Sequence, residues 1–172
     1  MTDRTLTGLD VIRFLCDFRN GVRPRIVAAI VAAKPEDIYR PGTIPGGNGD
    51  GSVFATFVHI VDVEESWLHE RLLGEGDKED PDPERYWDIA AVTAIWETVG
   101  HDWERHLADI TEEEITAPFV LGRGVTVPTW TIALHVFNHT THHRAEIWTA
   151  LTTFGEHPPE LEVLDFVDPR PV

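Results

Sequence analysis

The histidines of this chain are unevenly distributed, and one stretch holds a pair with the spacing of metal ligands. Four of the nine histidines fall within residues 131–155: His135, His139, His142 and His143. The stretch has helical periodicity, which places His139 and His143 on one face among apolar residues. Two imidazoles held in this way can point at one metal ion. Core histidines satisfied by hydrogen bonds would show the same pair, so the metal interpretation needs a third ligand.

A third histidine lies in a separate apolar stretch. Residues 52–73 predict a well-buried helix, and His59 lies on the margin of its apolar face between two apolar neighbours. A buried imidazole requires a hydrogen bond or a metal, so His59 is the candidate third ligand. We expect His101 and His106 at the surface. Cys16 has no adjacent histidine or basic residue, and we expect it in the core rather than as a reactive thiol.

Four helical segments must position these histidines. The apolar spacing predicts helices over residues 5–34, 52–73, 84–109 and 131–155. Pro24 should kink the first segment or divide it into two helices. The connection at 35–52 is rich in glycine and proline and is expected to lack regular structure. A second, charged connection follows at 74–83.

Local signals refine these boundaries. Ser52 and Thr129 are candidate N-caps, and Thr111 with Glu114 has the spacing of a capping box. Residues 117–128 contain two short β-like runs, which predict a small hairpin before the last helix. The expected fold is therefore all-α: an antiparallel four-helix bundle, residues 1–172 as a single domain, with a long second connection that crosses the bundle.

Composition excludes several classes of function. The net charge is −16, and we find no basic patch, so no nucleic acid and no membrane is expected as a partner. A length of 172 residues suits one domain with a sizeable core. Cys16 is the only cysteine, and it cannot form an intramolecular disulfide. A reducing, cytoplasmic location is the simplest expectation.

Two segments carry a family resemblance: HIVDVEESWL, which begins at His59, and HVFNHTTHHRAEIWTALTTFG, which begins at His135. Together they look like the DinB-like (YfiT-like) family of metal-dependent four-helix-bundle proteins. The resemblance implies that the metal ligands are His59, His139 and His143. Ala145 and Glu146 depart from the Gly-Gln that is commoner in the family. Glu146 could orient a ligand or face the solvent.

The ligand assignment within the last helix stays open at this point, because His135 and His142 lie near the other imidazoles. Three imidazoles suit Zn²⁺ or Ni²⁺ and leave a coordination position open, which favours a catalytic site over a structural one. The resemblance implies activation of a low-molecular-weight thiol for S-transfer to a small-molecule substrate. The alternatives are a hydrolase that uses metal-bound water, a non-catalytic metal-binding stress-response protein, and a purely structural bundle.

The resemblance also implies a homodimer. Phe137 and Trp148 lie roughly opposite the histidine face of the last helix, where they could meet a second copy. Packing of both rings within the monomer is the alternative.

Overall fold

The computed structural model describes residues 6–76, 85–121 and 124–167, and most of these residues are helical. The α-helices are α1 (Gly8–Ala32), α2 (Pro35–Ile38), α3 (Val53–Ser66), α4 (Ile89–Asp109), α5 (Glu112–Thr116) and α6 (Trp130–Thr153). A π-helical turn, η1 (Trp67–Leu72), continues α3, and a 3-10 turn, η3 (Val163–Phe166), lies in the C-terminal tail. Within these described residues, none of the helices combines the length and apolarity needed to cross a bilayer.

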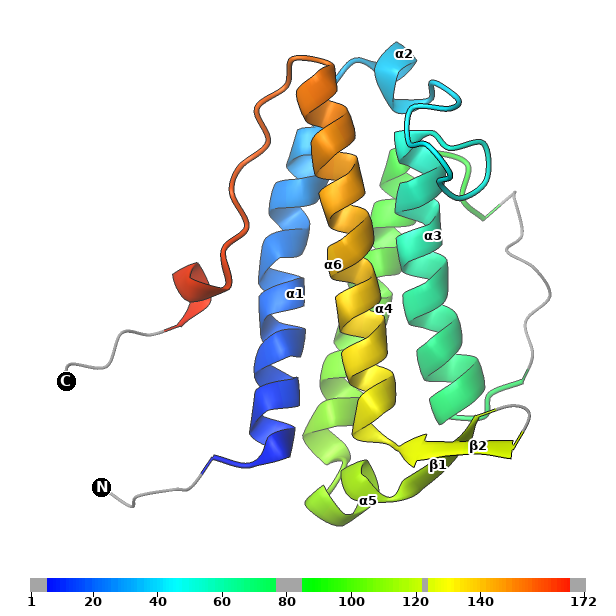
Figure 1. Cartoon of the computed structure of the whole chain (residues 1–172), viewed down its shortest axis with the longest axis vertical. Helices are drawn as coiled ribbons and strands as arrows, with labels where there is room; N and C mark the ends of the chain where they lie inside the picture. Colours follow the sequence, from blue (N-terminus) through cyan, green and yellow to red (C-terminus); the bar gives the residue numbers. More distant parts are fainter. Residues whose placement is uncertain (1–5, 77–84, 122–123, 168–172) are drawn as a thin grey trace.

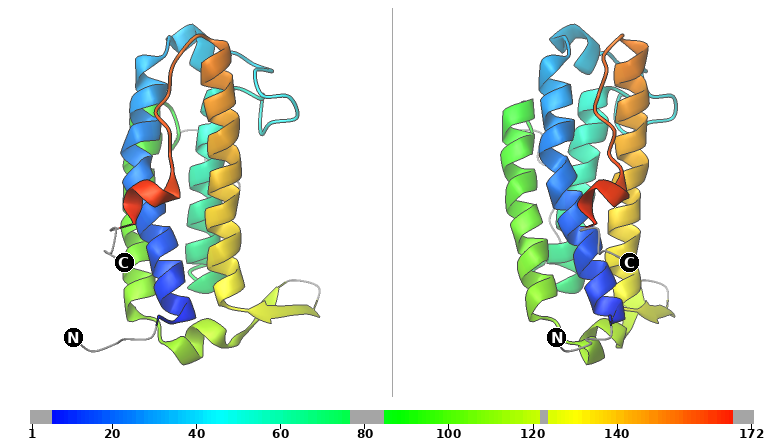
Figure 2. Two further views of the ribbon diagram at one scale, coloured as in Figure 1. Left: turned by 60° about the vertical axis from the view of Figure 1, so that its left-hand side comes forward. Right: turned by 90° about the vertical axis from the view of Figure 1, so that its left-hand side faces the viewer.

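The four long helices α1, α3, α4 and α6 lie side by side (Figures 1 and 2). Their colours in Figure 1 show that α1 and α6 run in one direction while α3 and α4 run in the other. Neighbouring helices are therefore not all antiparallel, which corrects part of the expected arrangement. Helix α3 ends at the opposite end of the molecule from the start of α4, and the predicted long connection between them includes residues 77–84, which lie outside the described residues.

Helix α1 runs through Pro24 without interruption, so of the two predicted alternatives, a kink or a division into two helices, the division is excluded. Proline removes one backbone hydrogen bond, and a helix interior tolerates this where packing holds it. Here Val22 and Ile26, on either side of Pro24, are fully buried. Thr7 adds a capping box with Asp10 at the N-terminus of α1.

The connection at 35–52 is more ordered than its composition predicts. Its first four residues form α2, with Pro35 at the first helical position, where its missing N–H has no helical partner to lose. Ile38, at the end of this turn, is buried and anchors it to the core. Farther along, Gly42 N donates to Asp50 O at 2.8 Å, and Ile44 N donates to Gly51 O at 2.8 Å.

The predicted cap of the second helix is confirmed: Ser52 accepts a hydrogen bond from Ala55 N at 3.0 Å. The capping box of Thr111 and Glu114 is confirmed as well. Thr129 does occupy the N-cap position of α6, but its hydroxyl donates to Ala117 O at 2.9 Å instead of capping the helix.

The predicted hairpin is present as an antiparallel pair, β1 (Pro118–Leu121) and β2 (Val125–Pro128), in which Phe119 faces Val127. Its predicted turn includes residues 122–123, which lie outside the described residues.

The core consists of two apolar clusters along the helices. Phe137 belongs to one of them and packs edge-on against Trp103 at 5.2 Å between ring centroids. Phe137 is therefore not available to a second copy, and of the two rings only the partly buried Trp148 could still contribute to the predicted homodimer. Cys16 is buried, as predicted, and burial raises the pKa of its thiol to about 11.

Of the two histidines expected at the surface, only His101 is exposed. His106 is partly buried, with its ring 6.2 Å from that of Trp103.

Candidate metal centre

Three histidines from two helices converge on one point. His59 lies on α3, and His139 and His143 lie one turn apart on α6. The Nε2 atom of His139 is 3.1 Å from His59 Nε2 and 3.1 Å from His143 Nε2. One ligand atom from each of the three residues lies within 4.8 Å of the other two, so this group could hold a metal ion. The structure thus brings together the three residues that the sequence singled out.

Hydrogen bonds between the rings cannot account for this arrangement. A neutral imidazole nitrogen either donates one hydrogen or offers one lone pair. The Nε2 atom of His139 lies close to two other Nε2 atoms, but it can form a hydrogen bond with only one of them, because its single N–H or lone pair lies in the plane of the imidazole ring. A cation at the centre would accept all three lone pairs at once. The donor set and its convergence therefore fit a metal ion better than they fit a hydrogen-bonded cluster.

The spacing of the nitrogens also suits a metal ion. With bonds of about 2.05 Å, nitrogens at right angles around a metal lie about 2.9 Å apart, and nitrogens at tetrahedral angles lie about 3.3 Å apart. The two Nε2–Nε2 distances of 3.1 Å fall between these values. Each of these two pairs of nitrogens is therefore spaced as two ligands of one metal ion would be.

Glu146 orients one of the three rings. Its Oε2 lies 2.7 Å from His143 Nδ1, and its Oε1 lies 3.3 Å from His142 Nε2. A carboxylate only accepts hydrogen bonds when ionised, so Nδ1 of His143 carries the hydrogen and Nε2 presents its lone pair. Of the two roles left open for Glu146, the structure favours orientation of a ligand over a free solvent-facing side chain.

The two additional histidines of α6 are placed differently. His142 is exposed and joins Glu146 and His143 in a second group whose ligand atoms lie within 4.8 Å. His135 is also exposed, and its ring packs against Trp67 at 5.2 Å between centroids. Neither residue belongs to the group formed by His59, His139 and His143.

The electrostatic environment favours the neutral form of two of the imidazoles, His59 and His139. Burial, reinforced by the neighbouring histidines, lowers the pKa of His139 to about 4. Burial and His143 also lower the pKa of His59 below its usual value. Metal binding requires the unprotonated ring, so this environment favours ligation at neutral pH. The Nδ1 atom of His139 is buried without a hydrogen-bond partner, and His139 therefore lacks the outer support that Glu146 gives His143.

A buried polar contact fixes α3 against α6 beside the histidines. Glu64 is fully buried, and it accepts hydrogen bonds from Thr140, next to His139, and from Arg19 Nη1 at 3.1 Å. Trp96 Nε1 donates to the same carboxylate at 2.7 Å. This contact was not predicted from the sequence, where its signal is that the apolar stretch 52–73 contains acidic residues.

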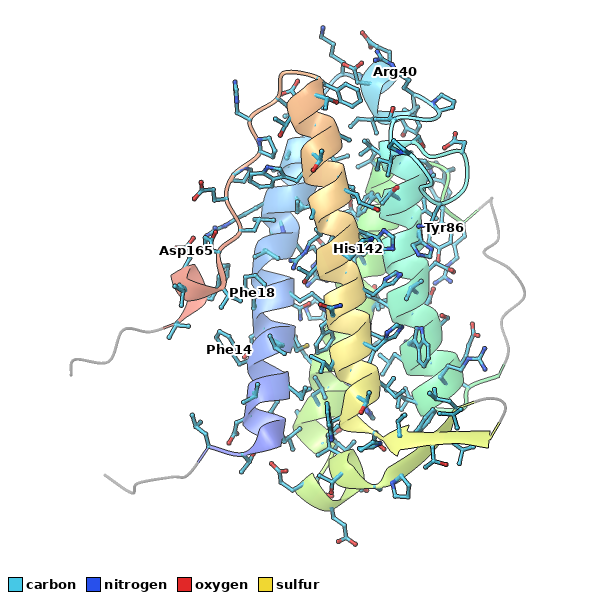
Figure 3. The ribbon with its side chains drawn as sticks, in the orientation of Figure 1. Phe14, Phe18, Arg40, Tyr86, His142 and Asp165 are labelled. Atoms are coloured by element: carbon cyan, nitrogen blue, oxygen red, sulfur yellow. The ribbon has the colours of Figure 1, made fainter. Side chains whose placement is uncertain are left out.

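A cavity of about 440 Å³ opens beside His59. Its lining is mixed: Tyr39, Asn48, Gly49, Asp50, Ser52, Phe54, Ala55, Val58, His59, Asp62 and Tyr86. Figure 3 labels Tyr86 near α3 and His142 on α6, the two helices that carry the converging histidines. A small molecule in this cavity would lie against a candidate metal ligand.

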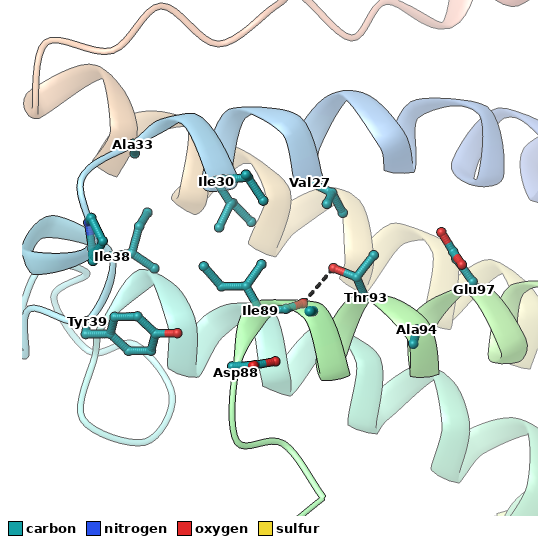
Figure 4. A pocket seen from close by; sticks show the side chains of 13 residues that line it. Val27, Ile30, Ala33, Ile38, Tyr39, Asp88, Ile89, Thr93, Ala94 and Glu97 are labelled. Atoms are coloured by element: carbon teal, nitrogen blue, oxygen red, sulfur yellow. Dashed lines mark hydrogen bonds between the residues drawn. The ribbon is translucent and has the colours of Figure 1, made fainter.

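A second cavity, of about 570 Å³, lies between α1, α2 and the start of α4 and contains none of the histidines (Figure 4). Its wall is mainly apolar, with Ile30 and Val27 facing Ile89 and Thr93, and the Thr93 hydroxyl donates to Ile89 O at 2.7 Å. It offers no chemistry related to the metal centre.

Fold and site together define a helical protein with three histidines on two adjacent helices that could hold one metal ion. The sequence model of the DinB family matches residues 24–171, which is most of the chain. The protein belongs to the DinB family. A search among curated proteins found none that matches this chain.

Proposed function

We propose that the protein binds one divalent ion, Zn²⁺ or Ni²⁺, through His59, His139 and His143, and activates a low-molecular-weight thiol for S-transfer to a small electrophile. The convergence of the three Nε2 atoms carries this proposal. We also propose that the four long helices form a four-helix bundle of the kind typical of the family, in which α1 and α6 run opposite to α3 and α4.

A bound divalent ion supplies one piece of chemistry: it lowers the pKa of a coordinated thiol, so that the thiolate is present at neutral pH. Three protein ligands leave room for such a thiol. The residues of the chain supply the rest. Glu146 holds His143 with its Nε2 lone pair toward the centre, and the cavity beside His59 receives the electrophile.

The nucleophile comes from outside the chain. Cys16, the only cysteine, is buried, and its thiol is protonated at neutral pH because burial raises its pKa to about 11. In the reaction, the sulfur of the added thiol forms a bond to the electrophilic carbon. The thiol proton passes to solvent, and the leaving group departs with its bonding electron pair.

The test uses metal-loaded protein with chlorodinitrobenzene or monochlorobimane and several cellular thiols in turn. We expect a rate enhancement that depends on one particular thiol and is lost in His139→Ala. The exposed His157, changed to alanine, provides the matched control and should retain the rate.

Three other outcomes would change the proposal. Thiol-independent turnover of esters or amides would favour a hydrolase that uses water. Metal binding without turnover of any substrate would favour a non-catalytic metal-binding protein. A metal content unchanged by a His139→Ala, His143→Ala double substitution would contradict the site itself.

A further inference from the structure

Arg144 is a buried cation with unmet hydrogen-bonding capacity. Its side chain is only 4% exposed, and its Nε and Nη1 atoms have no hydrogen-bond partner. Its Nη2 atom donates to Thr141 Oγ1 at 2.9 Å. Burial lowers the pKa of the guanidinium to about 10, which leaves it charged at neutral pH. A buried cation with unpartnered donors and no anion hydrogen-bonded to it is costly, so such a group is expected to meet an anion or water.

The nearby buried carboxylate does not fill this role. Glu64 raises the pKa of Arg144 through its charge, but its oxygens accept hydrogen bonds from Arg19, Trp96 and Thr140. Arg19 is itself buried and repels Arg144. The single carboxylate of Glu64 thus lies near two buried guanidinium groups. Of these two, Arg19 donates a hydrogen bond to it. This part of the interior carries an excess of positive charge.

Arg144 lines a cavity of about 450 Å³, a size that suits a small organic molecule. The cavity lies against α1, α6 and the tail segment that returns along these helices (Figure 2). The other lining residues are Phe18, Thr141, Ala145, Trp148, Thr149, Glu160, Leu161 and Glu162. The guanidinium carbon lies 5.4 Å from the centre of the Phe18 ring, so the cation and an aromatic wall adjoin each other.

We propose that this cavity binds a small organic monocarboxylate that carries an aromatic or branched apolar group. Its carboxylate replaces the Thr141 hydroxyl as the acceptor at Nη2 of Arg144, because both Thr141 and Arg144 line the cavity and a carboxylate forms a stronger, charge-assisted hydrogen bond with a guanidinium. Its apolar part packs against Phe18 and Trp148. This site is separate from the metal centre and does not depend on the proposed reaction.

The rim of the cavity selects against further negative charge. Glu160 and Glu162 line it from the tail, and both are exposed. They leave a single carboxylate attracted by the adjacent cation but repel a ligand with two or three carboxylates. The net charge of −16 acts in the same direction. A monocarboxylate is therefore the expected class, and a neutral analogue should bind poorly because it leaves the cation unpaired.

The test is a titration of the full chain with benzoate, followed by heat of binding and by the ¹H–¹⁵N resonances of the arginine side chains. Benzyl alcohol and phthalate are the neutral and dianionic comparisons. We expect benzoate to bind more tightly than either one and to shift the Arg144 Nε–H resonance. Arg144→Met should weaken benzoate binding by about tenfold or more, since it removes a charge-assisted hydrogen bond. The control is Arg105→Met, which removes an exposed arginine on α4.

A double variant at the rim keeps the proposal testable if Arg144→Met fails to fold. Glu160→Gln with Glu162→Gln leaves the core untouched and should tighten benzoate binding, because it removes repulsion at the rim. Metal-free protein should bind benzoate as tightly as metal-loaded protein. The proposal is overturned if benzoate leaves the Arg144 resonance unchanged, if benzyl alcohol binds as well as benzoate, or if binding disappears with the metal, which would place the carboxylate at the histidines.

Discussion

Glu146 Oε2 lies 2.7 Å from Nδ1 of His143, on the side of the ring opposite the converging nitrogens. The two residues are three apart on α6, so the helix itself sets this contact. It fixes the hydrogen on Nδ1 and directs the lone pair of Nε2 toward His139, which lies 3.1 Å away. A carboxylate that supports a metal-bound histidine in this way increases the basicity of the ligand.

Glu146→Gln should weaken metal binding without abolishing it. The amide can still accept a hydrogen bond from Nδ1 of His143, but it lacks the negative charge of the carboxylate. Loss of such outer support typically reduces metal affinity by about 10–100-fold. Competition with a chromophoric chelator would measure the change. Glu156→Gln, which lies beyond the end of α6, is the control, and equal affinities of the two variants would contradict a supporting role for Glu146.

The metal-free protein should lose stability in mild acid. Burial depresses the pKa of His139 to about 4 in the folded state, against an ordinary value of 6.5. Between these two pH values the unfolded chain binds more protons at this residue than the folded chain, so the free energy of unfolding falls as the pH falls. Above about pH 6.5 the residue makes no pH-dependent contribution.

Urea denaturation between pH 7.5 and 4.5 would measure this effect. Because carboxylates also titrate at the lower end, the informative quantity is the difference between the wild type and His139→Asn. We expect the wild type to lose stability more steeply between pH 6.5 and 4.5, by less than about 1.4 kcal/mol per pH unit, since the ring is only partly buried. Identical slopes of stability against pH in the two proteins would show that the pKa of His139 is not depressed in the folded state.

The tail should detach when Gly21 is changed to alanine. In the tail, the Phe166 ring packs edge-on against Phe18 at 5.2 Å between centroids. A Cβ added at Gly21 would lie 2.4 Å from the Phe166 ring and would displace it. Alanine also favours the helix by up to about 1 kcal/mol. We therefore expect little change in the overall unfolding free energy but faster proteolysis of the tail. The control is Gly8→Ala, where an added Cβ meets nothing within 4 Å.

Sequence predicts those features that depend on nearby residues. The spacing of His139 and His143, the capping of α3 by Ser52 and the hairpin all follow from local patterns, and the structure contains each of them. The continuity of α1 through Pro24 could not be predicted, because it depends on packing from other helices.

The histidine site likewise has one part that local sequence predicts and one part that depends on helix packing. Helical periodicity places two histidines on one face, but the approach of His59 from α3 depends on how the two helices pack. The sequence suggested His59 only through its lack of a local partner and through the family resemblance. The contact of Glu64 with Thr140 joins residues that are 76 positions apart, and no local pattern indicates it.

Removing the charge of Glu64 should be the most damaging single change in the core. Its carboxylate accepts hydrogen bonds from Arg19, Trp96 and Thr140, and so connects α1, α3, α4 and α6. In Glu64→Leu, Arg19 is left as a buried charge with no carboxylate partner, and the Trp96 and Thr140 donors lose their acceptor. Breaking one side of a buried ion pair typically costs about 3–5 kcal/mol.

Urea denaturation of the metal-free protein at pH 7 would measure the loss. Glu97→Leu on the exposed side of α4 is the matched control, and we expect it to change stability by less than about 0.5 kcal/mol. An additional Arg19→Met substitution should recover part of the loss in Glu64→Leu, because it removes the unpaired charge and keeps an apolar side chain of similar length. If Arg19→Met lowers stability further in the Glu64→Leu background, the damage comes from lost packing and not from an unpaired buried cation.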